Sequence, residues 1–428
     1  MIANLRLRLP EIQFSGISLN CENFVERHGS SAFPLCATNK PFYGMSYGRV
    51  TDQPWEQEAS VPQSDQNDSY LSSVKTALKR LPVLGSCLKA IRSWGRGFWR
   101  ESRHLVEGYR FLRAQDSLVV SGGGQLDEEW GGPWGHPFAL FKWAVLARIA
   151  GIPYVIVSVG ACKVASTTSR FFLSTALRMA EYRSYRDENS RAIAAELLHR
   201  AERDSVVPDL ALSLPCSELP PSSGIRSIAQ GRTVVAISPI VYAKPQNWPH
   251  EDPALYDRYV REMARAMSEL LERGYFLVMV WSTLGDKRVV PDLLENLGKE
   301  SSERLAKQTH IPRIETWRDL VAVLEDVDFL IASRLHSVIL GLLTKRPTIA
   351  VSFDPKVDLV MKDFGQTDYL LQLRNFAARE VIEAFDRIEL RRNLFVEQVG
   401  SYQDRFASAC ALQYDKLAAF ASSHHHHN

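Results

Sequence analysis

From about Asp116 onward, short apolar runs alternate with segments of helical periodicity, and no other feature of the chain limits the possible folds as strongly. Such alternation is typical of repeated strand–helix units, which build mainly parallel sheets covered by helices. The predicted strands are Ser117–Val120, Tyr154–Val159, Val234–Ser238, Phe276–Trp281, Asp328–Ala332 and Thr348–Ser352. Helices are predicted between them, among them Phe138–Ala150, Glu188–Ala201 and Tyr256–Arg273. The sequence therefore predicts an α/β fold.

The periodicity breaks between Leu212 and Arg232, where prolines, serines and a glycine precede a new strand. At 428 residues the chain exceeds the size at which a single core stops growing, so two domains are expected. We predict two Rossmann-like, doubly wound α/β domains that face a cleft, a GT-B-like arrangement. The predicted parts are residues 1–215, a linker 216–231, residues 232–376, helices at 377–421 that pack back across the second domain or the cleft, and a tail or tag at 422–428.

Composition narrows the class of protein. Fifty-one basic and forty-nine acidic residues leave a formal net charge of +2, which gives little support for nucleic-acid binding. The six cysteines are scattered and form no C-x-x-C pair, which favours reduced thiols in a cytoplasmic protein. The segment from Met1 to Pro10 lacks the apolar stretch of a signal peptide, and no histidine or cysteine spacing predicts a metal site.

One segment has a strong local charge. Between Leu71 and Arg113, ten lysines and arginines stand against Glu101 and Glu107, with leucines, tryptophans and a phenylalanine interleaved. Such an insertion could lie on an anionic membrane surface, or it could be the solvated face of a helical insertion. No nucleic-acid recognition motif accompanies it.

Two loops at predicted strand ends carry candidate ligand groups. Ser121-Gly122-Gly123-Gly124 follows the first strand, and glycines there let backbone N–H groups approach a ligand closely. We interpret this loop, with Asp127, as a substrate-lining loop, although a triple glycine alone is also compatible with a simple turn.

The second loop is Ser333-Arg334-Leu335-His336, between an apolar strand and a helical pattern. Arg334 supplies a permanent planar cation and His336 a side chain that exchanges protons near neutral pH, so the pair suits chemistry on an anion. Lys356 is expected at the neighbouring strand end of the same sheet. Arg186 precedes a predicted helix start, a position that favours anions, with a plain cap as the alternative.

Taken in order, these motifs resemble those of the polysaccharide pyruvyl transferase family over roughly residues 115–370. The matching positions are Ser121–Gly124, Gly160, Arg186-Asp187-x-x-Ser190, Pro208-Asp209, Ser333–His336 and Pro355-Lys356-Val357. The resemblance implies a GT-B-like fold and transfer of a pyruvyl group from phosphoenolpyruvate to two hydroxyls of a sugar, as a ketal. The implied acceptor is an exopolysaccharide or cell-surface glycan precursor, free or lipid-linked. It is expected on the side of residues 1–215, and phosphoenolpyruvate on the side of residues 232–376.

The resemblance also implies roles for individual residues. His336 and Arg334 are expected to be catalytic, and no metal or cofactor besides the co-substrate phosphoenolpyruvate is expected. The expected substrate-binding residues are Arg186, Lys356, Gly122, Gly123, Gly124, Asp127, Ser190 and Ser333. Family members usually begin with a strand and a G-x-x-N-x-G-D-type loop that have no counterpart here, and Cys162-Lys163 stands where relatives commonly carry glycine and proline.

Two other functions remain open from the sequence. A GT-B glycosyltransferase would use a nucleotide sugar in the same cleft, because a fold does not fix a function. Against it, no E-x-x-x-x-x-x-E pair lies near Ser333 to Leu343. A non-catalytic relative is the third reading. For the preferred reading we expect a cytoplasmic location, with possible peripheral contact at the inner face of the plasma membrane.

Overall fold

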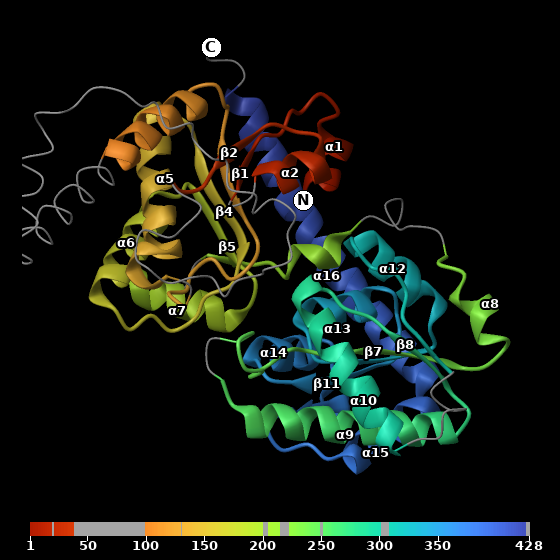
Figure 1. Ribbon diagram of the computed structural model, residues 1–428. Helices are drawn as coiled ribbons and strands as arrows, with labels where there is room; N and C mark the ends of the chain where they lie inside the picture. Colours follow the sequence, from red (N-terminus) through yellow and green to blue (C-terminus); the bar gives the residue numbers. More distant parts are fainter. Residues whose placement is uncertain are drawn as a thin grey trace, which may run out of the picture.

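The computed structural model describes residues 1–18, 21–37, 99–129, 131–199, 204–214, 222–248, 251–300 and 308–424. Two α/β halves, each built on a parallel sheet, lie against each other (Figure 1). This architecture confirms the predicted α/β, GT-B-like fold class.

The first half contains a four-stranded parallel sheet in the order β3-β4-β5-β6. Its strands are β3 (Leu118–Ser121), β4 (Tyr154–Val159), β5 (Tyr182–Tyr185) and β6 (Ser205–Val206). Strand β4 is buried along its whole length because helices cover both faces of the sheet, which explains its unbroken apolar run. Side chains at Tyr154 and Ile156 pack in the core of α5 (His136–Ala150), α6 (Thr167–Met179) and α7 (Glu188–Leu198).

The alternate residues of β4, Val155 and Val157, pack on the other face against both ends of the chain. They share a core with Leu5 of α1 (Ile2–Arg8) and with Cys410, Tyr414 and Leu417 of α16 (Arg392–His424). A small parallel pair, β1 (Gly16–Ser18) and β2 (Ala32–Pro34), flanks α2 (Cys21–His28) beside this half.

The second half contains a six-stranded parallel sheet in the order β12-β11-β10-β7-β8-β9. Its strands are β7 (Val234–Ser238), β8 (Phe276–Met279), β9 (Thr309–His310), β10 (Phe329–Ala332), β11 (Thr348–Ser352) and β12 (Leu370–Gln372). The chain adds strands on one side of β7 and then returns to add β10 on the other. Ligands of open α/β sheets bind outside the carboxyl ends of strands at such a switch point.

Helices cover both faces of this sheet (Figure 1). They are α8 (Ile225–Ala229), α9 (Pro253–Glu272), α10 (Val290–Glu300), α12 (Trp317–Asp326), α13 (Leu335–Leu343), α14 (Pro355–Asp363) and α15 (Ala378–Leu390). Short 3-10 helices are η1 (Gly132–Trp134), η2 (Leu210–Ser213), η4 (Leu284–Val289) and η5 (Thr367–Tyr369).

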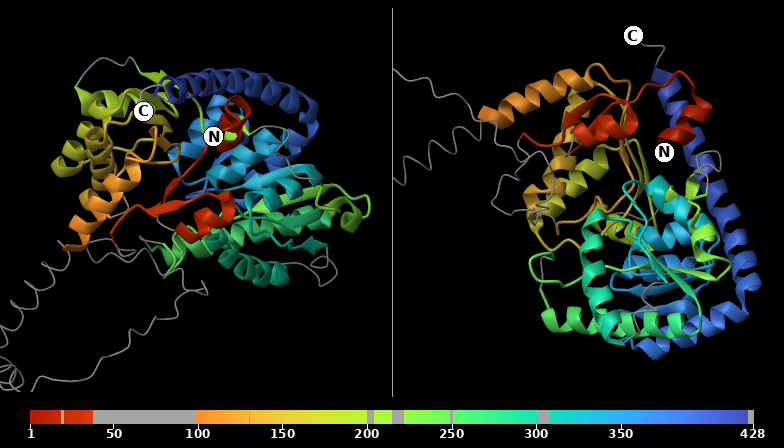
Figure 2. Two further views of the ribbon diagram at one scale, coloured as in Figure 1. Left: turned by 90° about the horizontal axis from the view of Figure 1, so that it is seen from above. Right: turned by 45° about the vertical axis from the view of Figure 1, so that its right-hand side comes forward.

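The long helix α16 runs along both halves (Figure 2). Its start lies on the second half, where Arg392 contacts Asp328 at 3.1 Å. Farther along, Gln413 is buried against the first half, where it hydrogen-bonds to Ser158 and Ser184. The C-terminal segment therefore packs on both halves and connects them.

Most of the basic segment at 71–113 lies outside the described residues. Its last part forms a helix at residues 99–112, on which Trp99 and Val106 are 71% and 51% exposed. Among the described residues, no helix is both long and apolar enough to span a membrane.

Candidate active site

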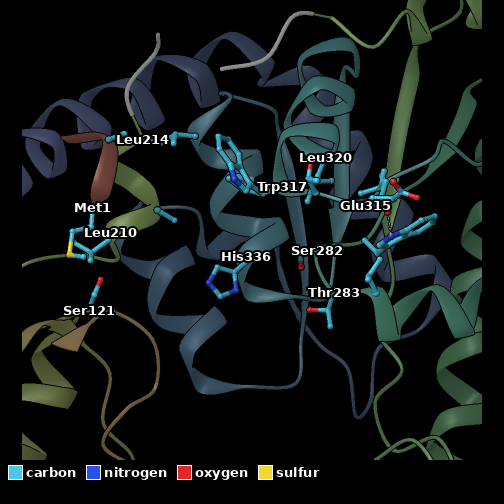
Figure 3. Close-up of a pocket in the computed structure, with 18 of the residues that line it drawn as sticks. Met1, Ser121, Leu210, Leu214, Ser282, Thr283, Glu315, Trp317, Leu320 and His336 are labelled. Atoms are coloured by element: carbon cyan, nitrogen blue, oxygen red, sulfur yellow. Dashed lines mark hydrogen bonds between the residues drawn. The ribbon is translucent and has the colours of Figure 1, made fainter. Parts of the chain in front are cut away.

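A cavity of about 690 Å³ lies between the two halves (Figure 3). From the first half it is lined by α1, η2 and the end of β3, where Ser121 and Gly122 lie. From the second half it is lined by residues 281–285 after β8, residues 314–317 before α12, and His336. The carboxyl ends of both sheets therefore contribute to its walls.

His336 is the second residue of α13, directly after β10. Its side chain is exposed, and its imidazole projects into the cavity (Figure 3). Within the described part of the chain, no hydrogen bond or ion pair holds this ring. The predicted proton-transfer residue thus lies where a ligand can reach it.

Arg334 is paired with a buried aspartate, Asp286. Its Nε and Nη2 donate to Oδ2 and Oδ1 of Asp286 at 2.6 and 3.0 Å, and its guanidinium lies over the ring of Trp248. Asp286 is fully buried and also accepts from the backbone N–H of Val241. Because two of its five N–H groups bind Asp286, Arg334 fixes the loop before His336, and its expected catalytic role stays a prediction.

Arg186 lies at the end of β5, against the end of β4. A Cβ at Gly160 would lie 2.4 Å from Nη2 of Arg186, so only glycine leaves room for the guanidinium. Arg186 lies 3.5 Å from both Asp187 and Asp209. Charge-assisted hydrogen bonds are usually about 2.7–2.9 Å, so these two contacts leave the donors of Arg186 weakly occupied.

Lys356 reaches the first half from the start of α14. Its Nζ lies 3.5 Å from the position of a Cβ on Gly124 and 4.0 Å from the carboxylate of Asp354. Asp127 also lies beside Gly124, since its Oδ2 is 3.3 Å from the same Cβ position. The structure therefore brings Lys356 and Asp127, predicted separately, to one glycine.

Asp127 also faces His136, which stands at the end of the same glycine-rich loop in the sequence. The Oδ1 of Asp127 and the Nδ1 of His136 are 3.8 Å apart, and both atoms are buried without a hydrogen bond. Burial raises the pKa of Asp127, and the charges of His136 and Lys356 oppose that rise. No local signal could have paired these residues, because the fold of the glycine-rich loop brings them together.

The glycine loop is held at the end of β4. Gly122 and Gly123 have φ of +57° and +71°, in the left-handed region that favours glycine. The backbone N–H of Gly160 donates to the carbonyl of Gly123 at 2.7 Å, and Leu126 forms a bridge with Ala161. Gly122 lines the cavity, whereas Gly124 lies beside Asp127 and Lys356.

Two predicted substrate-binding serines instead have structural roles. Ser190 is buried, and its hydroxyl accepts from the backbone N–H of Ala161. Ser333 is fully buried and shares a hydrogen bond with the hydroxyl of Tyr259. Ser190 lies in the first turn of α7 and Ser333 directly before Arg334, and both side chains are shielded from solvent.

Among the described residues, no group of three or more histidine, cysteine, aspartate or glutamate side chains is arranged to hold a metal ion.

Comparisons with known proteins agree with the motifs. A family model described as polysaccharide pyruvyl transferase matches residues 60–355. No curated protein gives a significant match to the sequence.

Several solved structures are similar in fold. The Anabaena protein HepE, in complex with UDP, is 12% identical, with 75% of this chain and 82% of that chain covered and a TM-score of 0.47. A UDP-forming trehalose-phosphate synthase from Burkholderia xenovorans is 10% identical, with 76% and 79% covered and a TM-score of 0.48. UDP-GlcNAc 2-epimerase from Methanocaldococcus jannaschii is 10% identical, with 67% of this chain and 74% of that chain covered and a TM-score of 0.47.

Proposed function

The chain belongs to the polysaccharide pyruvyl transferase family, and from this premise we propose that it transfers a pyruvyl group from phosphoenolpyruvate to a sugar of a surface-glycan precursor, forming a ketal. The observation that carries the proposal is that the exposed side chain of His336 lines the cavity between the two halves. A transferase that joins two substrates needs such a shared space, with a proton-transfer group inside it.

The proposed donor, phosphoenolpyruvate, matches two cationic side chains whose contacts with carboxylates are long. Phosphoenolpyruvate carries a carboxylate and a phosphate, and Arg186 and Lys356 offer one cation from each half of the molecule. Their contacts with carboxylates are 3.5 Å or longer, so an incoming anion can replace them. We therefore assign anion binding to Arg186 and Lys356, with Arg334 holding the loop.

The reaction needs a group that moves protons. Protonation of the methylene carbon of phosphoenolpyruvate creates an oxocarbenium-like centre, which one sugar hydroxyl attacks as it loses its proton. The carbon–oxygen bond to phosphate then breaks, and the second hydroxyl attacks and loses its proton. His336 is our candidate for one of these transfers, a contribution typically worth about 10²–10⁴-fold in rate.

The test is phosphate release from phosphoenolpyruvate in the presence of free and lipid-linked glycans. We expect release that requires both an acceptor and His336, so that His336→Ala lowers the rate about 10²–10⁴-fold. His199→Asn is the matched control, since His199 is an exposed helix-end histidine at the far end of α7 from Arg186. Full turnover by His336→Ala would contradict its assignment.

We also propose that the helix at residues 99–112 contacts the anionic inner face of the plasma membrane. Trp99, Arg103, Val106 and Arg110 recur at helical spacing and are all exposed. An apolar and cationic stripe of this kind suits anionic lipid.

Sedimentation with vesicles tests the membrane contact. The protein should pellet with phosphatidylglycerol vesicles and remain in solution with phosphatidylcholine vesicles. Replacing Trp99 by serine and Arg110 by glutamine should reduce the pelleted fraction several-fold. If the variant and the parent chain pellet alike, this helix is a solvated face.

A further inference from the structure

The cleft has two chemically different parts, and this difference indicates where the acceptor binds. We propose that the cavity beside His336 binds the acceptor as a neutral glycan, through the face of a sugar ring, while phosphoenolpyruvate binds outside this cavity at Arg186 and Lys356. The proposal rests on the proposed function, because it allocates that reaction's two substrates to separate places.

The walls of the cavity do not suit an anion. No lysine or arginine side chain is among its lining residues, and the one lining carboxylate, Glu315, is held by Arg313 at 2.8 Å. The amino group of Met1 also borders the cavity, but burial lowers its pKa and so disfavours its charged form. A charged group that leaves water without an opposite charge pays a large desolvation cost. Phosphoenolpyruvate, with its carboxylate and phosphate, is therefore poorly matched to this cavity.

The same walls suit a sugar. Most of the lining is apolar, and hydroxyl groups are distributed over it. The apolar lining side chains include Leu210, Leu214, Trp281, Ile314, Leu320 and Leu340. The hydroxyl groups come from Ser121, Ser282, Thr283 and Thr316. Hydroxyl side chains both donate and accept hydrogen bonds, as sugar hydroxyls do. A volume of about 690 Å³ is also within the usual range of small-ligand pockets.

Trp317 supplies an aromatic surface for the sugar ring. It begins α12, and its indole borders the cavity on the side that faces His336 (Figure 3). The guanidinium of Arg318 lies over one face of this ring, 4.5 Å from its centroid, so the opposite face is the one proposed for the sugar. An indole offers a large apolar face of fixed orientation, against which the C–H groups of one sugar face can pack. Trp281 fixes this wall, because its indole N–H donates to the carbonyl of Ile314 at 3.1 Å.

The strand order places His336 between the two parts of the cleft. Along the sheet edge, the segments that follow β9 and β8 line the cavity, β10 carries His336, and β11 leads to Lys356. A sugar in the cavity and phosphoenolpyruvate near Lys356 would therefore approach His336 from opposite sides. This arrangement puts the proton-transfer group where the new bond forms.

Binding measured without turnover tests the proposal. The ligands are phosphoenolpyruvate and the neutral disaccharides lactose, cellobiose and N,N′-diacetylchitobiose, titrated separately by calorimetry into the full chain. Trp317→Ala should weaken disaccharide binding at least tenfold and change phosphoenolpyruvate binding less than twofold. Lys356→Ala should do the reverse. Trp134→Ala, a half-exposed tryptophan outside the cavity, should change neither.

The possible outcomes separate this inference from the proposed function. Trp317→Phe keeps an aromatic face and should retain disaccharide binding within a few-fold, which controls for misfolding of the alanine variant. The inference is overturned if Trp317→Ala weakens phosphoenolpyruvate instead, or if no neutral disaccharide binds the parent chain. Disaccharide binding that depends on Trp317, without any binding of phosphoenolpyruvate, would keep this inference and reject the proposed donor.

Discussion

The three cationic side chains of the cleft differ in the length of their contacts with carboxylates. Arg334 holds Asp286 at 2.6 and 3.0 Å, whereas the carboxylate contacts of Arg186 are 3.5 Å and that of Lys356 is 4.0 Å. Short paired contacts fix a side chain, and long ones leave it able to bind another anion. Cationic side chains at the strand ends of the two sheets therefore differ in how firmly they are already held.

Replacing Arg334 should act first on stability. Arg334→Ala leaves the fully buried Asp286 without its cation, a change that typically costs about 3–5 kcal/mol. Urea unfolding should show this loss, and the double variant Arg334→Ala with Asp286→Ala should recover part of it. If Arg334→Ala instead keeps the parent stability but loses phosphoenolpyruvate binding, Arg334 binds the substrate directly.

Asp127 should make stability depend on pH in an unusual direction. Burial raises its pKa in the folded state, so the folded protein binds this proton more tightly than the unfolded chain does. Stability from this residue is therefore present at low pH and is lost as pH rises through the folded-state pKa. Asp127→Asn should raise the unfolding midpoint at pH 7 relative to the parent chain, with the gap closing below about pH 4.

A parent chain that is more stable than Asp127→Asn at pH 7 would contradict this expectation. It would mean that the ionised carboxylate is a stabilising partner of His136 and not a group kept buried for the reaction.

At the scale of elements, the long apolar strands could be predicted and the short polar ones could not. The six predicted strands are present with small shifts at their ends. The strands β1, β2, β5, β6, β9 and β12 were missed because they have two to four residues and a weak apolar pattern. In β5, for example, Arg183 is tolerated because Asp204 pairs with it at 2.8 Å.

The same limit applies to the candidate site. Loops at strand ends could be located, since a loop's place depends on the local apolar pattern. The interaction partners of the loop residues could not be predicted. Asp286 lies forty-eight positions before Arg334, and His136 meets Asp127 only through a folded loop. The sequence therefore located the cations correctly but could not show which of them are already paired.

Gly160, directly after β4, provides the space that the guanidinium of Arg186 occupies, and this can be tested. Gly160→Ala would place a Cβ 2.4 Å from Nη2 of Arg186 and should displace the guanidinium. We expect phosphoenolpyruvate binding to weaken about tenfold or more, measured by calorimetry. Gly298→Ala is the control, since nothing lies within 4 Å of its Cβ position in α10, and it should leave binding unchanged. Equal binding in both variants would exclude Arg186 from the donor site.

At the scale of the molecule, the two halves are joined by the chain's own ends. Helix α16 contacts Asp328 in the second half through Arg392, and it packs with Tyr414 on β4 of the first half. Helix α1 lies beside it, where Arg8 contacts Asp415 at 2.6 Å. Because the cavity walls come from both halves, these contacts help to set the distance between His336 and the loop after β3.

The most direct test of the central claim follows the pyruvyl group itself. The chain is incubated with isotope-labelled phosphoenolpyruvate and a glycan that supports phosphate release, and the glycan is then examined by NMR and mass spectrometry. We predict that the label appears on the glycan as the methyl and carboxylate of a cyclic ketal, and that His336→Ala lowers the rate of this transfer about 10²–10⁴-fold. Label that remains in phosphoenolpyruvate or appears only as free pyruvate would contradict it.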